Sequence, residues 1–148
     1  MKTQAKIKYS IRFNNLTENQ RKSLSLLLHT RIEDIKNQNN NKERNNLATK
    51  IKNIDNPEKH LEELGIIYRK SESFLEPKTP VKEALFRLFI YNNNKPLTVK
   101  QISKQLSELW EMSQFPRDIG EEKLTNLLKN ISDYYIQPYG RKFYIKNY

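Results

Sequence analysis

Side chains that could carry out acid–base or metal chemistry are few in this chain and far apart. Its two histidines, His29 and His60, lie in separate segments of helical pattern, and it has no cysteine. Without thiolates a metal site would need carboxylates, but the neighbouring pair Glu33-Asp34 has the pattern of a solvated helix surface. Three widely spaced glycines cannot form a phosphate-binding loop. We therefore expect no enzyme, no metal and no cofactor.

The composition favours attraction to a polyanion. Lys and Arg outnumber Asp and Glu by 27 to 17, and the formal charge is +10. Such a field raises the rate of encounter with nucleic acid and, second, with an anionic membrane surface. Residues 1–13 and 134–148 carry basic side chains and no acid. With no signal peptide, no membrane span and no cysteine, we expect a cytoplasmic protein, associated with the nucleoid if it binds DNA.

Side chains suited to nucleic acid gather in the second half of the chain, on two predicted helices. Lys100 and Lys104 lie on the outer face of a helix over 99–111, which Thr98 can cap. A third helix, at about 119–131, has four candidates: Asn126 and Lys129 face outward, and Lys123 and Asn130 flank them. The carbonyl and NH2 groups of an Asn side-chain amide can both bond adenine, and Lys can reach guanine or phosphate.

The start of this third helix is acidic. Glu121 and Glu122 repel phosphate, although they also complement the positive end of the helix. Asp118-Ile-Gly-Glu121 can form a capping box there. The connection before it, from Trp110 to Arg117, is longer than the turn of a minimal helix-turn-helix.

A basic hairpin is predicted over 134–148. Gln137-Pro-Tyr-Gly140 fits a type I turn, with proline at the second position and glycine at the fourth. This places Tyr139, Arg141 and Lys142 at the tip, where they could touch a minor groove or a phosphate.

The best internal boundary is Glu76–Pro80, because proline forces its preceding residue out of helical conformation. We expect two parts, residues 1–76 and 79–148, with Thr79 capping a helix over 80–92. Besides its main apolar stripe, this helix has Phe86 and Ile90 on a second face. Residues 1–75, or a second protomer, are expected to cover that face.

The N-terminal part begins with a strand. Ile7, Tyr9, Ile11 and Phe13 alternate with polar residues, which predicts one buried face. Because a lone strand is unstable, it must pair with the C-terminal hairpin, another N-terminal segment or a second protomer.

Helices follow this strand. Thr17 and Gln20 form a capping box at the start of a helix over about 18–37. After the Asn-rich stretch 37–46, a short helix is expected around Ile51, and Asn56-Pro57 starts another. Gly65 and the Ile66-Ile67 pair leave a strand over 66–72 as the alternative to helix.

Residues 79–148 resemble the winged helix-turn-helix superfamily of DNA-binding domains. The segment Pro-Leu-Thr-Val-Lys-Gln-Ile-Ser, residues 96–103, is similar to the start of the second helix in many members. The resemblance implies a third helix in the major groove and a wing beside it. The long connection after the second helix and the acidic start of the third depart from this pattern. The expected fold class is mainly α with a small β component (α+β).

The resulting hypothesis is a small transcriptional regulator that binds duplex DNA. Its contacts would be Lys100, Lys104, Lys123, Asn126, Lys129, Asn130, Tyr139, Arg141 and Lys142. A homodimer through residues 1–75 and the second face of helix 80–92 is a further expectation, and a membrane partner is not expected. The alternative is a winged-helix module for protein interaction or assembly, with tyrosines as anchors.

Overall fold

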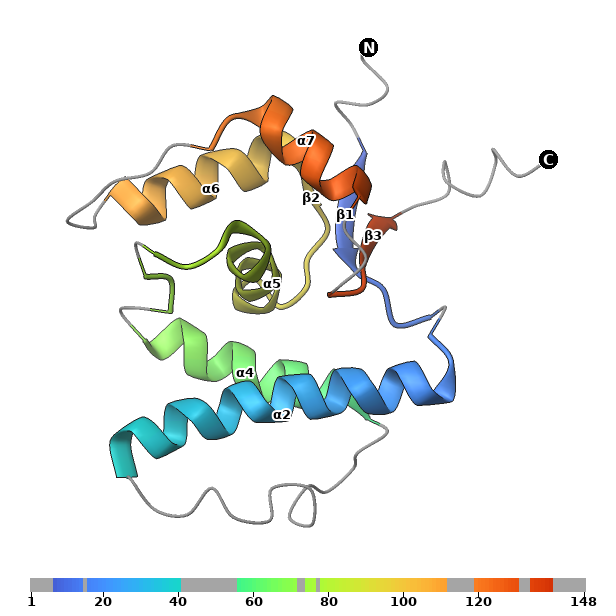
Figure 1. The fold of residues 1–148 in the computed structure, drawn as a ribbon, viewed down its shortest axis with the longest axis vertical. Coiled ribbons are helices and arrows are strands. Elements are labelled where there is room, and N and C mark those ends of the chain that lie inside the picture. The colour runs from blue at the N-terminus through green and yellow to red at the C-terminus, as the bar shows by residue number, and fades with distance from the viewer. Residues whose placement is uncertain are drawn as a thin grey trace. The chain divides into compact units, whose positions relative to one another are not determined.

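The computed structural model describes residues 7–14, 16–40, 56–71, 74–76, 78–111, 119–130 and 134–139, with side chains to residue 36 in the first helix. Its elements are β1 (Lys8–Ile11), α2 (Glu18–Asn40), α4 (Pro57–Lys70), α5 (Val81–Tyr91), β2 (Leu97–Thr98), α6 (Val99–Glu111), α7 (Glu121–Asn130) and β3 (Ile136–Tyr139) (Figure 1). Helices joined to one small antiparallel sheet confirm the predicted α+β class.

The chain divides into two compact units. The helical unit is Phe13–Glu72, and the mixed unit is Met1–Arg12 together with Ser73–Tyr148. The sequence-based division had placed the N-terminal strand with residues 1–76. The structure groups it with the C-terminal half because β1 finds its hydrogen-bonding partners, β2 and β3, there. The helical unit is therefore inserted between the first two strands of the sheet.

The helical unit is a pair of helices, α2 and α4, packed on each other. The capping box at the start of α2 is confirmed: the Thr17 N–H donates to Gln20 Oε1 at 2.8 Å, and the Gln20 N–H donates to Thr17 Oγ1 at 3.1 Å. Leu24, Leu28 and Ile32 are fully buried along one stripe. The short helix predicted around Ile51 lies outside the described residues.

Helix α4 settles the ambiguity over residues 66–72. Asn56 caps the helix by accepting from the Lys59 N–H, and the helix then runs through Gly65 to Lys70. The alternative of a strand is therefore wrong. The reason is the spacing of Leu61, Leu64 and Tyr68, which places all three on one buried stripe only in a helix.

The mixed unit is built around α5, with α6 and α7 crossing on one side of it and the strands beside it (Figure 1). The main stripe of α5 is buried as predicted, and Phe86 and Ile90 on its second face are fully buried too. The Phe86 ring stacks on Tyr134, with ring centroids 4.6 Å apart. A residue of the mixed unit itself therefore covers part of that second face.

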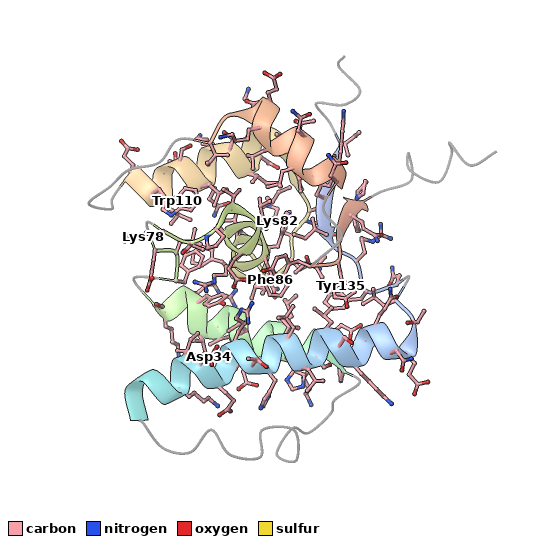
Figure 2. The ribbon with its side chains drawn as sticks, viewed as in Figure 1. Asp34, Lys78, Lys82, Phe86, Trp110 and Tyr135 are labelled. Atoms are coloured by element: carbon pink, nitrogen blue, oxygen red, sulfur yellow. The ribbon has the colours of Figure 1, made fainter. Side chains whose placement is uncertain are left out.

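Two side chains fix the segment that leads into α5. The N-cap of α5 is Pro80, not Thr79 as predicted. Thr79 instead closes a turn, its Oγ1 accepting from the Glu76 N–H at 2.9 Å. Trp110, in the last turn of α6, is fully buried and donates its indole N–H to the Glu76 carbonyl at 3.0 Å (Figure 2).

The sheet has the order β2-β1-β3, with both pairings antiparallel. The N-terminal strand is therefore central, and of its three predicted partners the C-terminal segment is confirmed. The prediction that only one face of this strand is buried is wrong, since Ser10 is 2% and Arg12 5% exposed. Arg12 is buried because its side chain lies along β3, donating to the Pro138 carbonyl and lying over the Tyr139 ring.

The turn predicted at Gln137–Gly140 is also wrong for the residues that the structure describes. Gln137, Pro138 and Tyr139 are paired in β3 opposite Ser10, Tyr9 and Lys8. The pairing with β1 offers this segment a hydrogen-bonding partner that the local turn pattern does not take into account. Arg141, Lys142 and the returning strand lie outside the described residues.

Candidate nucleic-acid interface

Helix α7 presents a continuous polar face to solvent. Leu124 and Leu128, buried at 0% and 4% exposure, anchor its inner side. That anchoring leaves the four predicted side chains of the third helix exposed: Lys123, Asn126, Lys129 and Asn130. Because they are spaced three and four residues apart, they fall on one side of the helix. The structure therefore brings these predicted residues together.

The two asparagines on this face are not equivalent. The Asn130 side chain donates to the backbone carbonyl of Asn126 at 3.0 Å. The Asn126 amide makes no hydrogen bond within the residues that the structure describes. Asn126 can therefore bond a ligand without first breaking a hydrogen bond within the helix, whereas the Asn130 side chain must give up its bond to the Asn126 carbonyl.

An open groove runs beside this face, between α7 and the start of α5. Its lining is Val81, Lys82, Lys123, Asn126, Leu127 and Asn130, and its volume is ≈ 390 Å³. Lys82 comes from α5 (Figure 2) and had not been singled out from the sequence. No local pattern could have indicated it, because the groove exists only where α5 and α7 pack. The result is a polar rim with two lysines above the apolar side chains of Val81 and Leu127.

The first turn of α7 is acidic, as expected. Glu121 and Glu122 are both exposed and sit where the helix has its unpaired N–H groups. They stabilise that end of the helix. The basic side chains follow them along the helix, so the positive part of α7 starts at Lys123.

Helix α6 carries the other predicted lysines. Lys100 and Lys104 are exposed, one helical turn apart, on the side opposite the buried Ile102 and Leu106. A capping box fixes the start of this helix: the Gln101 N–H donates to Thr98 Oγ1 at 3.2 Å, and the Thr98 N–H donates to Gln101 Oε1 at 2.9 Å. The predicted cap at Thr98 is confirmed.

The last described site residue, Tyr139, ends β3 with 51% of its surface exposed. The guanidinium carbon of Arg12 lies 5.5 Å from the centre of its ring. The same guanidinium donates to the Pro138 carbonyl at 2.8 Å, which holds it beside the ring. Tyr139 is thus a strand residue instead of the predicted hairpin tip, and Arg12 is a neighbour that sequence reasoning missed.

The titratable groups elsewhere in the described part of the chain include two histidines and several acidic side chains. Across those residues no group of three or more histidine, cysteine or acidic side chains could hold a metal ion. None of the described helices combines the length and the apolar composition needed to cross a bilayer.

No protein-family model matches this sequence, and no curated protein or solved structure matches it. The side chains gathered on α6, α7 and the sheet are therefore the basis on which a function can be proposed.

Proposed function

We propose that this protein binds duplex DNA, as a small transcriptional regulator of the winged-helix kind, with α7 as the helix that enters the major groove. The order α5, β2, α6, α7, β3 supports the resemblance seen in residues 79–148. The observation that carries the proposal is the exposed face of α7, where Lys123, Asn126 and Lys129 lie together.

Each side chain has a defined role in this proposal. Lys100, Lys104, Lys123 and Lys129 pair with phosphates, which supplies affinity for any duplex. Asn126 reads a base edge, because its amide can bond the N6 and N7 groups of adenine together. Arg141 and Lys142 act as additional phosphate contacts from the segment that follows β3.

The salt dependence of duplex binding tests the proposal. Six phosphate contacts predict a slope of about −5.4 for log affinity against log salt, or roughly a 2,000-fold loss between about 50 and about 200 mM. Replacing two of them, Lys123→Ala with Lys129→Ala, should lower the steepness of this slope by about 1.8. Fluorescence anisotropy of a labelled duplex measures both quantities.

A matched control is available in the helical unit. Lys59 and Lys70 are exposed on α4, so Lys59→Ala with Lys70→Ala removes the same charge away from α7. We expect this pair to leave most of the slope intact. Equal effects of the two double variants would show only non-specific attraction, and absence of duplex binding would refute the proposal.

The alternative is a protein-interaction module. Two observations favour it: the exposed Glu121 and Glu122, and the apolar lining that Val81 and Leu127 give the groove. In that case Leu127→Glu would abolish capture of one stoichiometric protein partner. Binding of DNA would then be weak and insensitive to the α7 lysines.

A further inference from the structure

The outer face of the sheet has one open row. Lys8 pairs with Thr98 on one side and with Tyr139 on the other, and directly paired residues point to the same face. The opposite face holds Tyr9 and Leu97, which are 6% and 5% exposed and belong to the core. The Thr98–Lys8–Tyr139 row therefore lies on the outer face, where Lys8 and Tyr139 are exposed.

Burial changes along this face. The next residue of β1 on the outer side, Ser10, is 2% exposed, and Arg12 beyond it is 5% exposed. Among the described residues of this face, the Lys8 row has exposed side chains on two neighbouring strands, whereas in the Ser10 row only Gln137 is exposed. The Arg12 guanidinium lies over the Tyr139 ring at the edge of this row, and that cation is fixed to the Pro138 carbonyl. The exposed aromatic ring is thus held in place by a buried charge.

We propose that this row is a second nucleic-acid site, at which an unpaired base stacks on Tyr139 and the adjoining phosphate pairs with Lys8. Stacking on an aromatic ring is open to every base, because each has a π face. A base inside a duplex has both faces covered by its neighbours, so an unpaired base is the fitting ligand. Arg12 is a positioning residue: it holds the Tyr139 ring in the place where the base would stack.

Charge and chain length support this ligand. The outer-face residues Lys8, Ser10, Arg12, Thr98, Gln137 and Tyr139 include two cations and no acid. Only five residues separate Asn130 of α7 from Ile136 of β3, which limits their Cα separation to roughly 20 Å. One DNA molecule with a paired and an unpaired part can therefore span both sites.

This inference rests on the proposed function only in taking nucleic acid as the ligand. The test compares a blunt duplex with the same duplex carrying a single-stranded overhang that contains 2-aminopurine. We expect the protein to bind the overhang DNA more tightly than the blunt duplex. We also expect the fluorescence of 2-aminopurine to be quenched on binding. Tyr139→Ala should weaken overhang binding by about 5- to 150-fold, the range for loss of one stacking ring, and should weaken blunt-duplex binding much less.

Three further variants keep the result interpretable. Tyr139→Phe retains the ring and should bind like the original protein. Tyr139→Leu keeps apolar bulk in β3 without an aromatic face and should lose the quenching. Gln137 is exposed on the same side of β3 as Tyr139, and Gln137→Ala should change neither the overhang affinity nor the blunt-duplex affinity. A circular-dichroism spectrum confirms that each variant is folded.

The outcomes separate the two proposals. Duplex binding with no gain from the overhang, or with a gain that Tyr139→Ala does not alter, overturns the stacking site alone. Overhang binding that depends on Tyr139 without blunt-duplex binding supports this site and refutes the α7 interface. A protein partner captured through Tyr139, with no quenching of 2-aminopurine, also overturns the stacking site.

Discussion

At the scale of single residues, the helical unit contains a pair of histidines with incomplete hydrogen bonding. The rings of His29 and His60 meet edge to face, with centroids 5.5 Å apart. Buried nitrogen atoms on both, Nδ1 of His29 and Nε2 of His60, have no hydrogen-bond partner among the described residues. Glu33 and Lys36 of α2 and Glu63 of α4 face this pair. A neutral imidazole tolerates this setting better than a charged one does.

His29 should make stability depend on pH. Burial lowers the pKa of His29, and the attraction of Glu33 only partly offsets it. The unfolded chain therefore binds a proton more readily than the folded one. This contribution to stability is present above about pH 6.5 and is lost as the pH falls through the folded pKa. Urea unfolding followed by far-ultraviolet circular dichroism, at several pH values between about 5.5 and about 7.5, measures the effect.

His29→Gln is the matched variant, since it cannot titrate in this range. We expect its stability to vary less with pH than that of the original protein. An unchanged pH dependence in His29→Gln would show that another group is responsible.

The pKa of Glu58 is also shifted: burial raises it, but hydrogen bonds from Arg21 and the backbone outweigh this and lower it. Its titration therefore falls below the range measured.

At the scale of elements, a side chain completes the connection between α5 and the sheet. Asn94 donates its amide N–H to the Ile11 carbonyl and accepts from the Ile11 N–H, each at 2.8 Å. Since Tyr9 pairs with Leu97, these bonds continue the β1–β2 ladder beyond the two residues of β2. In this register Lys95 lies opposite Ile11, but the Lys95 N–H donates to the Asn92 carbonyl at 3.1 Å, so the Asn94 side chain takes its place.

Replacing Asn94 by glycine should destabilise the mixed unit by about 1–3 kcal/mol, because it leaves two buried backbone groups of Ile11 without partners. Asn93 provides the control. Both asparagines have positive φ, 58° and 59°, so glycine relieves similar backbone strain at each. Trp110 is the single tryptophan and lies in this unit, so its fluorescence during urea unfolding reports the change. Equal stability of Asn93→Gly and Asn94→Gly would contradict the role given to Asn94.

At the scale of the whole molecule, the mixed unit depends on residues from both sides of the inserted helices. β1 supplies the central strand, and its Tyr9 and Ile11 side chains are 6% and 1% exposed. Without this strand β2 and β3 have no partner between them, and the core side chains Leu97 and Ile136 lose their cover.

A chain that begins at Phe13 should therefore lose the cooperative unfolding of the mixed unit. The control is a chain that begins at Ile7, which keeps all of β1. Trp110 fluorescence during thermal or urea unfolding distinguishes them, and a synthetic peptide of residues 7–14 should restore the transition in the shorter chain. A cooperative transition at unchanged urea concentration in the chain starting at Phe13 would refute the importance of β1.

The parts of the fold that were predictable are those set by neighbours in sequence. The capping box at Thr17, the cap at Thr98 and the asparagine–proline start of α4 identified the beginnings of three helices. Apolar spacing in α6 and α7 also indicated which lysines and asparagines face outward. These features depend on contacts within a few residues, so the sequence contains all that decides them.

The incorrect predictions concern longer distances. A turn at Gln137–Gly140 satisfies local preferences, but pairing with a strand more than a hundred positions away overrides them. Arg12 is buried through contacts with residues of that distant strand. The groove that includes Lys82 requires α5 and α7 to pack together, and no period in either helix indicates this.

The sequence by itself thus determined the charge, the outward face of α7 and the α+β class, because composition and helical period act locally. Only the tertiary structure decided that the N-terminal strand is central, that the histidine rings meet, and that Lys8, Arg12 and Tyr139 share one face. Pairing between distant segments is decided by hydrogen bonding and burial over the whole chain, and local preference yields where these oppose it.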